Sequence, residues 1–191
     1  PWRGLPPAGP PWPWLAWCAL LPLLWTVDRL GAMPAAQPLP GACLLVLMAG
    51  WPLATLAFVP VAALAAWLGD LSAGEALQRA LWLGLVPATL ALGLGGAVRR
   101  WLPRHLFVYI FGRGFIATAL ANMAAGAAQV FAQPLPRGLA LEDLLLARGL
   151  AGWSDAILTG MIVAIFVAFR PEWLATYADR LYLPTRDGDN R

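Results

Sequence analysis

The chain contains no lysine, a single histidine and few charged residues of either sign. All 13 basic residues are arginines, and charged residues make up only 12% of the 191 residues. A typical soluble domain has about a quarter charged residues. Hydrophobic residues instead account for 60% of the chain. This composition is typical of an integral membrane protein.

These shortages exclude several functions. A metal site built from several histidines cannot form within the chain, because His105 is the only one. The net charge is +3 and no basic run is longer than Arg99-Arg100, so we expect no nucleic-acid binding. Cys18 and Cys43 lie in apolar segments without pairing or metal-ligand spacing, which indicates small packing residues.

Motifs of catalysis are also missing from the sequence. No serine has a histidine and a carboxylate at a suitable membrane depth to form a triad. The glycine-rich stretch 93–96 ends an apolar segment and follows no strand, so it does not fit a nucleotide-binding loop. We therefore expect that the chain is not an enzyme, and the sequence identifies no cofactor.

Long apolar segments dominate the chain. A helix that spans a membrane needs about 20 apolar residues. Four segments qualify as candidates: 12–27, roughly 77–98, 106–132 and 151–169. A fifth apolar run, 41–69, is interrupted by Gly-Trp-Pro, and predicts either one long kinked helix or a short helix followed by a full one. The expected fold is an all-α, polytopic membrane helix bundle with five or six transmembrane helices.

Three regions follow from this pattern: a proline-rich segment 1–11, a transmembrane bundle 12–170 and a C-terminal tail 171–191. The chain begins with Pro1 rather than Met, which leaves two alternatives open: an upstream segment that is missing or removed, or Pro1 as the true start. The most basic loop holds Arg99, Arg100, Arg104 and His105, which predicts that it faces the cytoplasm. The tail then lies on the same side. Five spans would put the N-terminus outside and six would put it inside.

Local signals mark several helix boundaries. Ser72 and Glu75 have the spacing of a capping box, which predicts that a helix begins there. Pro171 follows the last apolar segment and predicts its end. Leucines next to acidic residues in the stretch 139–148 predict a short interfacial helix on the outer side.

Three polar residues fall within apolar segments and are candidate intramembrane functional groups: Arg113, Asn122 and Asp155. Arg113 is seven residues into its segment, so it either extends to the headgroups or binds a buried partner or an anion. Asn122 is expected to hydrogen-bond between helices. Asp155 lies near the outer end of the last segment, at a different depth from Arg113, and we do not expect the two to pair.

Small residues recur every four positions in the last apolar segment: Gly152, Ala156, Gly160, Ala164 and Ala168. Such a stripe lets another helix approach closely. It predicts either packing within the bundle or a docking face for a partner subunit.

Three segments carry a resemblance to a known family: GACLLVLMAGWPLA (41–54), LPRHLFVYIFGRGFIATAL (102–120) and LTGMIVAIFVAFRPEWLATYADRLYL (158–183). From about Trp14 onward, the chain resembles a bacterial family of predicted membrane permeases. That family is related to the cobalt/nickel substrate-binding components of energy-coupling-factor ABC transporters.

The resemblance implies a subunit of the bacterial inner membrane that captures a small substrate outside. Its expected partners are the lipid bilayer, a coupling subunit and ATPases. In metal-transporting relatives a free N-terminal amine and histidines bind the cation, whereas this chain reads Gln-Pro-Leu-Pro-Gly-Ala at 37–42 without a histidine. Relatives often have Asn in place of Arg113 and Glu in place of Asp155. These differences do not favour nickel or cobalt, which prefer imidazole.

Two functions therefore remain open at the level of sequence. The first is the substrate-binding permease component of such a transporter. The second is a non-catalytic structural or accessory subunit of a larger membrane complex, for example a respiratory or photosynthetic one. The family resemblance favours the first, and the missing histidines favour the second.

Overall fold

A computed structural model describes residues 12–30, 37–103, 105–133 and 140–177. Every regular element within these ranges is helical, which confirms the all-α prediction. The proline-rich segment 1–11 and most of the C-terminal tail lie outside the described residues.

Four helices are long and apolar enough to cross a membrane. Two of them contain wider π-helical stretches within a continuous helix. Their bounds are α4 (Trp51–Gly69); α5 (Ala73–Arg79) with η2 (Ala80–Leu85) and α6 (Val86–Trp101); η3 (Val108–Ile116) with α7 (Ala117–Ala132); and α8 (Leu141–Phe169). Shorter helices are α1 (Pro13–Trp25), α2 (Val27–Leu30), α3 (Ala42–Ala49) and η4 (Pro171–Trp173).

The structure confirms the capping box and corrects one boundary. Ser72 accepts from the Glu75 backbone N–H, and the Glu75 side chain accepts from Ser72 N at 2.9 Å. The prediction of a separate interfacial helix within 139–148 was wrong. From Leu141 on, these residues form the first turns of α8 itself. Gly149 and Gly152 do not stop the helix, because packing on α7 compensates for their low helix propensity.

The interrupted apolar run 41–69 forms a short helix followed by a full one. The two helices are separated at Gly50, which has a φ of 79° that glycine tolerates without strain. Pro52 lies in the first turn of α4, where a missing backbone N–H costs little. The proline therefore starts the second helix and does not kink a continuous one.

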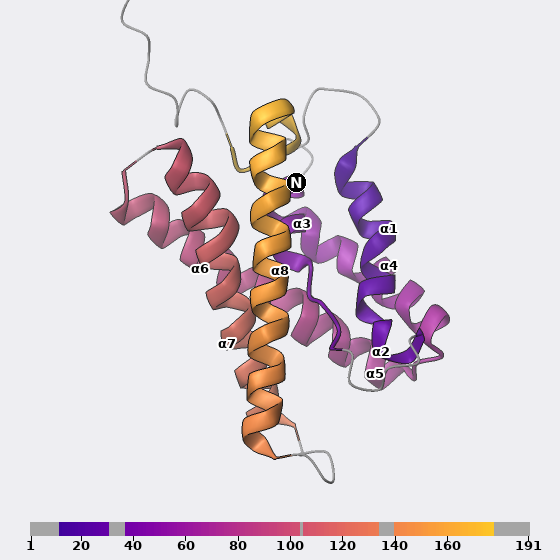
Figure 1. Cartoon of the computed structure of the whole chain (residues 1–191). Helices are drawn as coiled ribbons and strands as arrows, with labels where there is room; N and C mark the ends of the chain where they lie inside the picture. The colour runs from indigo at the N-terminus through magenta and orange to yellow at the C-terminus, as the bar shows by residue number, and fades with distance from the viewer. Residues whose placement is uncertain (1–11, 31–36, 104, 134–139, 178–191) are drawn as a thin grey trace, which may run out of the picture.

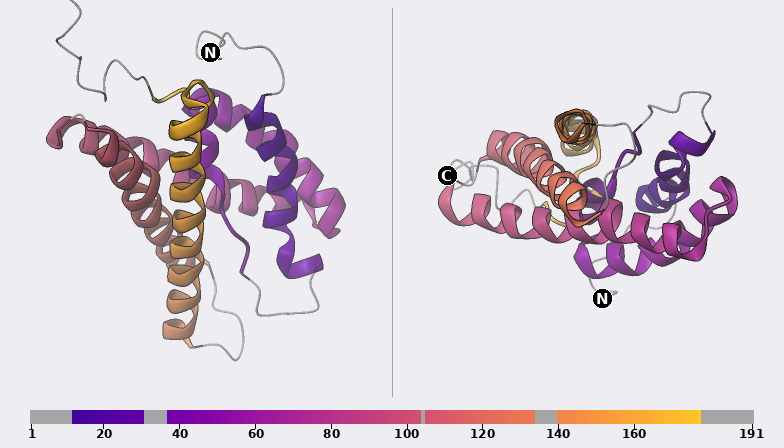
Figure 2. Two further views of the ribbon diagram at one scale, coloured as in Figure 1. Left: turned by 45° about the horizontal axis from the view of Figure 1, so that its top comes forward. Right: turned by 90° about the horizontal axis from the view of Figure 1, so that it is seen from below.

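The helices alternate in direction along the bundle. The start of α1 and the end of α8 both lie at the upper end of the molecule in Figure 1. Four helical segments have the length and composition of membrane spans: α4 and the helices 73–101, 108–132 and 141–169. With 13 residues, α1 is a shorter apolar helix. Figure 2 shows that helix 73–101 crosses α7 and α8 at a wide angle. α8 packs mainly on α7 and η3.

The segment between α2 and α4 that the structure describes is only partly helical. Residues 37–41 are non-helical, and they run upward between the surrounding helices before α3 begins (Figure 2). Gly41, at the junction, has a φ of 62°. All eight residues of α3 are buried, so this short helix forms part of the interior. We call residues 37–49 the interrupted segment.

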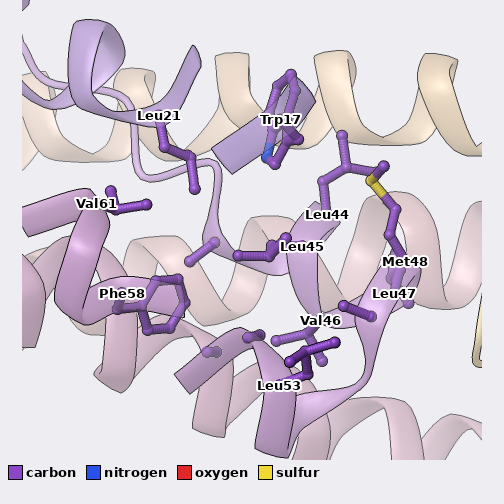
Figure 3. Close-up of a cluster of buried hydrophobic side chains, with 14 of the residues drawn as sticks. Trp17, Leu21, Leu44, Leu45, Val46, Leu47, Met48, Leu53, Phe58 and Val61 are labelled. Carbon is purple, nitrogen blue, oxygen red and sulfur yellow. The ribbon is translucent and has the colours of Figure 1, made fainter. Parts of the chain in front are cut away.

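The interrupted segment forms much of the hydrophobic core. Figure 3 shows side chains of α3, among them Leu44 and Leu45, between Trp17 and Leu21 of α1 and Phe58 of α4. Leu21, Leu44 and Leu45 are fully buried. An eight-residue helix is not stable alone in water, so this packing is what stabilises α3.

Ion pairs join α2 to α5 at the lower end of the bundle. Arg79 donates two hydrogen bonds to the Asp28 carboxylate, each 2.7 Å long. Arg29 pairs with Glu75, the residue that also completes the capping box. The lower ends of α1 and of helix 73–101 are therefore fixed to one another.

Gly41→Ala is expected to destabilise the fold. A Cβ at this position would lie 2.6 Å from Leu21 Cδ2, and the positive φ is strained for alanine. We expect the free energy of unfolding to fall by roughly 2 kcal/mol or more. The measurement is thermal unfolding of the purified protein in detergent. Gly74→Ala is the matched control, because a Cβ there meets nothing within 4 Å. Equal midpoints for the two variants would contradict the assigned role of Gly41.

Candidate functional site

The polar backbone of the interrupted segment is paired within the bundle. Pro38 and Pro40 have no N–H to satisfy. Leu39 N donates to Leu24 O at 3.3 Å. The carbonyl oxygens of Pro40 and Gly41 accept from the indoles of Trp25 and Trp17, each at 2.8 Å. Because lipid offers no hydrogen-bond partners, non-helical backbone at this depth requires such contacts.

Asp155 of α8 holds the point where the extended chain becomes helix. Its Oδ1 accepts from Gly41 N at 3.0 Å, and its Oδ2 accepts from Asn122 Nδ2 at 2.6 Å. The side chain of Asp155 is fully buried and Asn122 is 3% exposed. A carboxylate at the start of a helix also interacts favourably with the helix dipole. Asp155 therefore stabilises the start of α3 by hydrogen bonding and by charge.

Cys43 in the first turn of α3 joins this group. Its thiol lies 3.6 Å from Asn122 Oδ1 and 3.8 Å from Pro87 O, both within range of a weak S–H donor. Asn122 thus bridges α3 and α8 through both ends of its amide. The packing prediction for Cys43 accounts for its burial but not for this contact.

The C-terminal end of α3 is capped by the chain that follows α8. Ala175 N and Thr176 N donate to the carbonyls of Met48 and Leu47 at 3.2 and 3.3 Å. The Thr176 hydroxyl lies 3.2 Å from the same Leu47 oxygen and 2.8 Å from the Tyr109 hydroxyl. Carbonyls that a short helix leaves unpaired are satisfied in this way.

Arg113 belongs to this second end. Its Nη1 donates to Thr176 O at 3.4 Å, and its guanidinium lies 5.5 Å from the centre of the Tyr109 ring. Gly95 makes room, since a Cβ there would lie 3.0 Å from Arg113 Nε. A cation near the C-terminal end of α3 complements the helix dipole. Arg113 and Asp155 do not pair with each other; they lie at opposite ends of α3.

The stripe of small residues divides into a packed part and an exposed part. A Cβ on Gly152 would lie 3.1 Å from Asn122 Cβ, and one on Gly160 would lie 3.3 Å from Phe115 Cβ. Ala156 is fully buried. Ala164 is half-buried and Ala168 is exposed. The close approach at Gly152 brings Asn122 within reach of Asp155.

Several residues of the site were not singled out in the sequence. One is Gly41, which lies within the interrupted segment; the others are Trp17, Trp25 and Thr176, which contact it. All four are residue types common in membrane proteins, so the sequence alone does not mark them. The available signal was Pro-Leu-Pro-Gly at 38–41 directly before an apolar run. Such a stretch indicates backbone without helical pairing, which needs partners from elsewhere in a membrane.

No group of three or more His, Cys, Asp or Glu side chains is arranged to hold a metal ion within the described part of the chain. Comparison with family models, with curated proteins and with solved structures finds no match to this chain. The functional proposal below is therefore based on the contacts at the two ends of α3.

Asp155→Ala is expected to release the start of α3. The change leaves Gly41 N–H and the Asn122 amide without their acceptor, at about 1–3 kcal/mol for each buried group. Amide hydrogen exchange at residues 41–44 should accelerate, and the thermal midpoint should fall. Asp143→Ala, in the exposed first turn of the same helix, is the matched control. Unchanged exchange at Gly41 in Asp155→Ala would contradict this arrangement.

Thr176→Val tests the other end of α3. The hydroxyl contacts with Leu47 and Tyr109 are lost while the backbone N–H remains, so we expect a loss of about 1–2 kcal/mol. Limited proteolysis after residue 173 should become faster. Thr89→Val, an exposed threonine on α6, serves as the comparison. Equal proteolysis rates would show that the hydroxyl does not hold this end.

Proposed function

We propose that the chain is the substrate-binding membrane subunit of a small-solute transporter. The observation that supports this is the interrupted segment in the middle of the bundle, with Asp155 at one end of α3 and Arg113 at the other. Interrupted helices near the bilayer midplane are typical of secondary transporters, where their ends and unwound backbone bind substrates and ions.

The cost of the interruption strengthens the proposal. A continuous apolar helix would need no tryptophan indoles, buried carboxylate or buried amide to satisfy its backbone. Buried polar groups are expensive in hydrocarbon and usually mark function. The chain nevertheless places the buried Asn122 and Asp155 and the partly buried Arg113 around α3.

A small cavity lies beside the junction between the extended residues 37–41 and α3, which we call the break. It is lined by Pro38, Pro40, Asn122, Gln129 and Arg148, among others, and its volume is about 10 Å³. That space holds roughly one water molecule. A larger solute would therefore enter only when the extended chain 37–41 moves away from α7 and α8.

The family resemblance supplies the proposed partners and location. A coupling subunit and ATPases would act with the chain in the bacterial inner membrane. Arg99 and Arg100 at the end of α6 favour a cytoplasmic position for that end of the bundle. The C-terminus would share that side.

A second candidate function is an accessory subunit of a larger membrane complex. An apolar groove of about 510 Å³ lies between α4 and the α5–η2 helix, and its lining includes Ala63, Ala66, Ala73, Ala76 and Ala80. Small residues permit close approach of another helix. This groove favours a protein partner but does not require transport.

Copurification separates the two candidates. The tagged chain is isolated in mild detergent at native expression level, and its partners are identified by mass spectrometry. We expect a second membrane protein together with ATPases. A respiratory or photosynthetic complex without ATPases would instead support the accessory role and contradict the proposal. Elemental analysis of the same sample tests nickel and cobalt, since a chain that binds either should retain a near-stoichiometric amount.

A pair of variants shows whether the groove contributes to these contacts. Ala63→Leu fills the groove from an exposed position on α4, and Ala128→Leu places the same side chain on an exposed face of α7. Loss of one partner from Ala63→Leu alone would assign that partner to the groove. Retention of every partner would place the contacts elsewhere.

A further inference from the structure

Five polar or nucleophilic side chains from three helices are buried next to the break. Their exposed fractions are 3% or less: Cys43 of α3, Thr118 and Asn122 of α7, and Asp155 and Thr159 of α8. Two of these, Thr118 and Thr159, have no part in the pairing of the interrupted segment described above. A structural role for the site therefore leaves these two hydroxyls unexplained.

The packing of α7 and η3 on α8 places the hydroxyls at a similar level. Gly114 contacts Val163, and eight residues later Asn122 contacts Gly152, so the two helices run antiparallel in close contact. Thr118 lies halfway between Gly114 and Asn122. Thr159 falls within the facing stretch of α8. Both threonines thus lie within the interface between these helices.

The two hydroxyls share faces with the polar groups already described. Thr118 lies one turn before Asn122, and Thr159 lies one turn after Asp155, so each pair occupies one face of its helix. Thr118 also faces the Cys43 thiol. The Asn122 amide oxygen points to the same thiol, at 3.6 Å.

The Asp155 carboxylate has no compensating positive charge in the residues that the structure describes, and the neighbouring threonine hydroxyls have little to bind. The oxygens of Thr118 and Thr159 are buried. Thr159 has no hydrogen-bond partner among the described residues, and Thr118 faces only the weak S–H donor of Cys43. Asp155 forms none of the ion pairs found in the described part of the chain. An uncompensated carboxylate inside a membrane bundle is costly and calls for a cation or a proton.

We propose that this cluster binds a monovalent cation of sodium size. The ligands would be the Asp155 carboxylate, the hydroxyl oxygens of Thr118 and Thr159, and the Asn122 amide oxygen. One carboxylate balances one positive charge, and an all-oxygen set suits a hard cation. A proton would neutralise Asp155 but leave the Thr159 hydroxyl without a partner. The bound cation would hold α3, α7 and α8 together at the break.

Histidine and cysteine spacing does not reveal this cluster, because threonine and asparagine oxygens have no such spacing signature in a sequence. The cation site also goes beyond the proposed transport function, because an ion at the break could stabilise either a transporter or an accessory subunit.

Sodium binding to the purified chain tests the proposal. Thermal midpoints are compared in sodium chloride and in choline chloride at equal ionic strength, and binding is measured directly with radioactive sodium. We expect a saturable rise of the midpoint in sodium only, because a ligand that binds the folded state stabilises it. Thr159→Val should weaken sodium binding about tenfold or more.

Thr159→Val is the most informative variant because it should fold. Its hydroxyl makes no hydrogen bond among the described residues, so valine removes a ligand without breaking a contact. Thr118→Val repeats the test from α7. Thr55→Val is the control, since Thr55 bonds only to Pro52 O at the surface of α4.

Three results would overturn the cation site. The first is the absence of any sodium-specific shift or binding in the unmodified protein. The second is full retention of both in Thr159→Val and Thr118→Val. The third is a midpoint that responds to pH but not to sodium and loses this response in Asp155→Asn, which would assign the carboxylate to a proton. None of these results bears on copurified ATPases, so failure here is separate from failure of the transport proposal.

Discussion

The structure depends on one constraint: inside hydrocarbon, each backbone N–H and C=O must find a partner within the protein. The four long helices meet it mainly with hydrogen bonds inside each helix. The interrupted segment does not, and residues from distant parts of the chain complete it. The indoles of Trp17 and Trp25 donate to its carbonyls, and Asp155 accepts from its Gly41 N–H. The residues after α8 cap the C-terminal end of α3. The positions of α1, α7 and α8 follow from this requirement.

The two ends of α3 also differ in charge. The Asp155 carboxylate lies at the N-terminal end of α3. The Arg113 guanidinium lies near the C-terminal end, where it donates to the carbonyl of Thr176. Each charge has the sign that the dipole of α3 favours. The same eight-residue helix therefore explains why Asp155 and Arg113, which cannot reach one another, are both present in apolar segments.

Sequence patterns predicted the fold class, the capping box at Ser72 and the long apolar helices, because each depends on local composition or spacing. They also identified Arg113, Asn122 and Asp155 as unusual. The hydrogen-bond partners of these residues could not be predicted from sequence, because Gly41 and Asp155 are 114 positions apart and no periodicity links them. The predicted start of α8 was wrong for a related reason. The amphipathic stretch 141–148 has the composition of an interfacial helix, but contact with α7 extends it into the span.

The same separation has a consequence for biogenesis. A chain is inserted from its N-terminus, so residues 37–41 emerge long before Asp155 is synthesised. Until α8 arrives, Gly41 lacks its acceptor and α3 lacks the chain that caps it. An unpaired extended segment is not tolerated in lipid. The hydrogen bonding of the interrupted segment is therefore complete only once α8 and the residues after it are in place, although the segment comes early in the sequence.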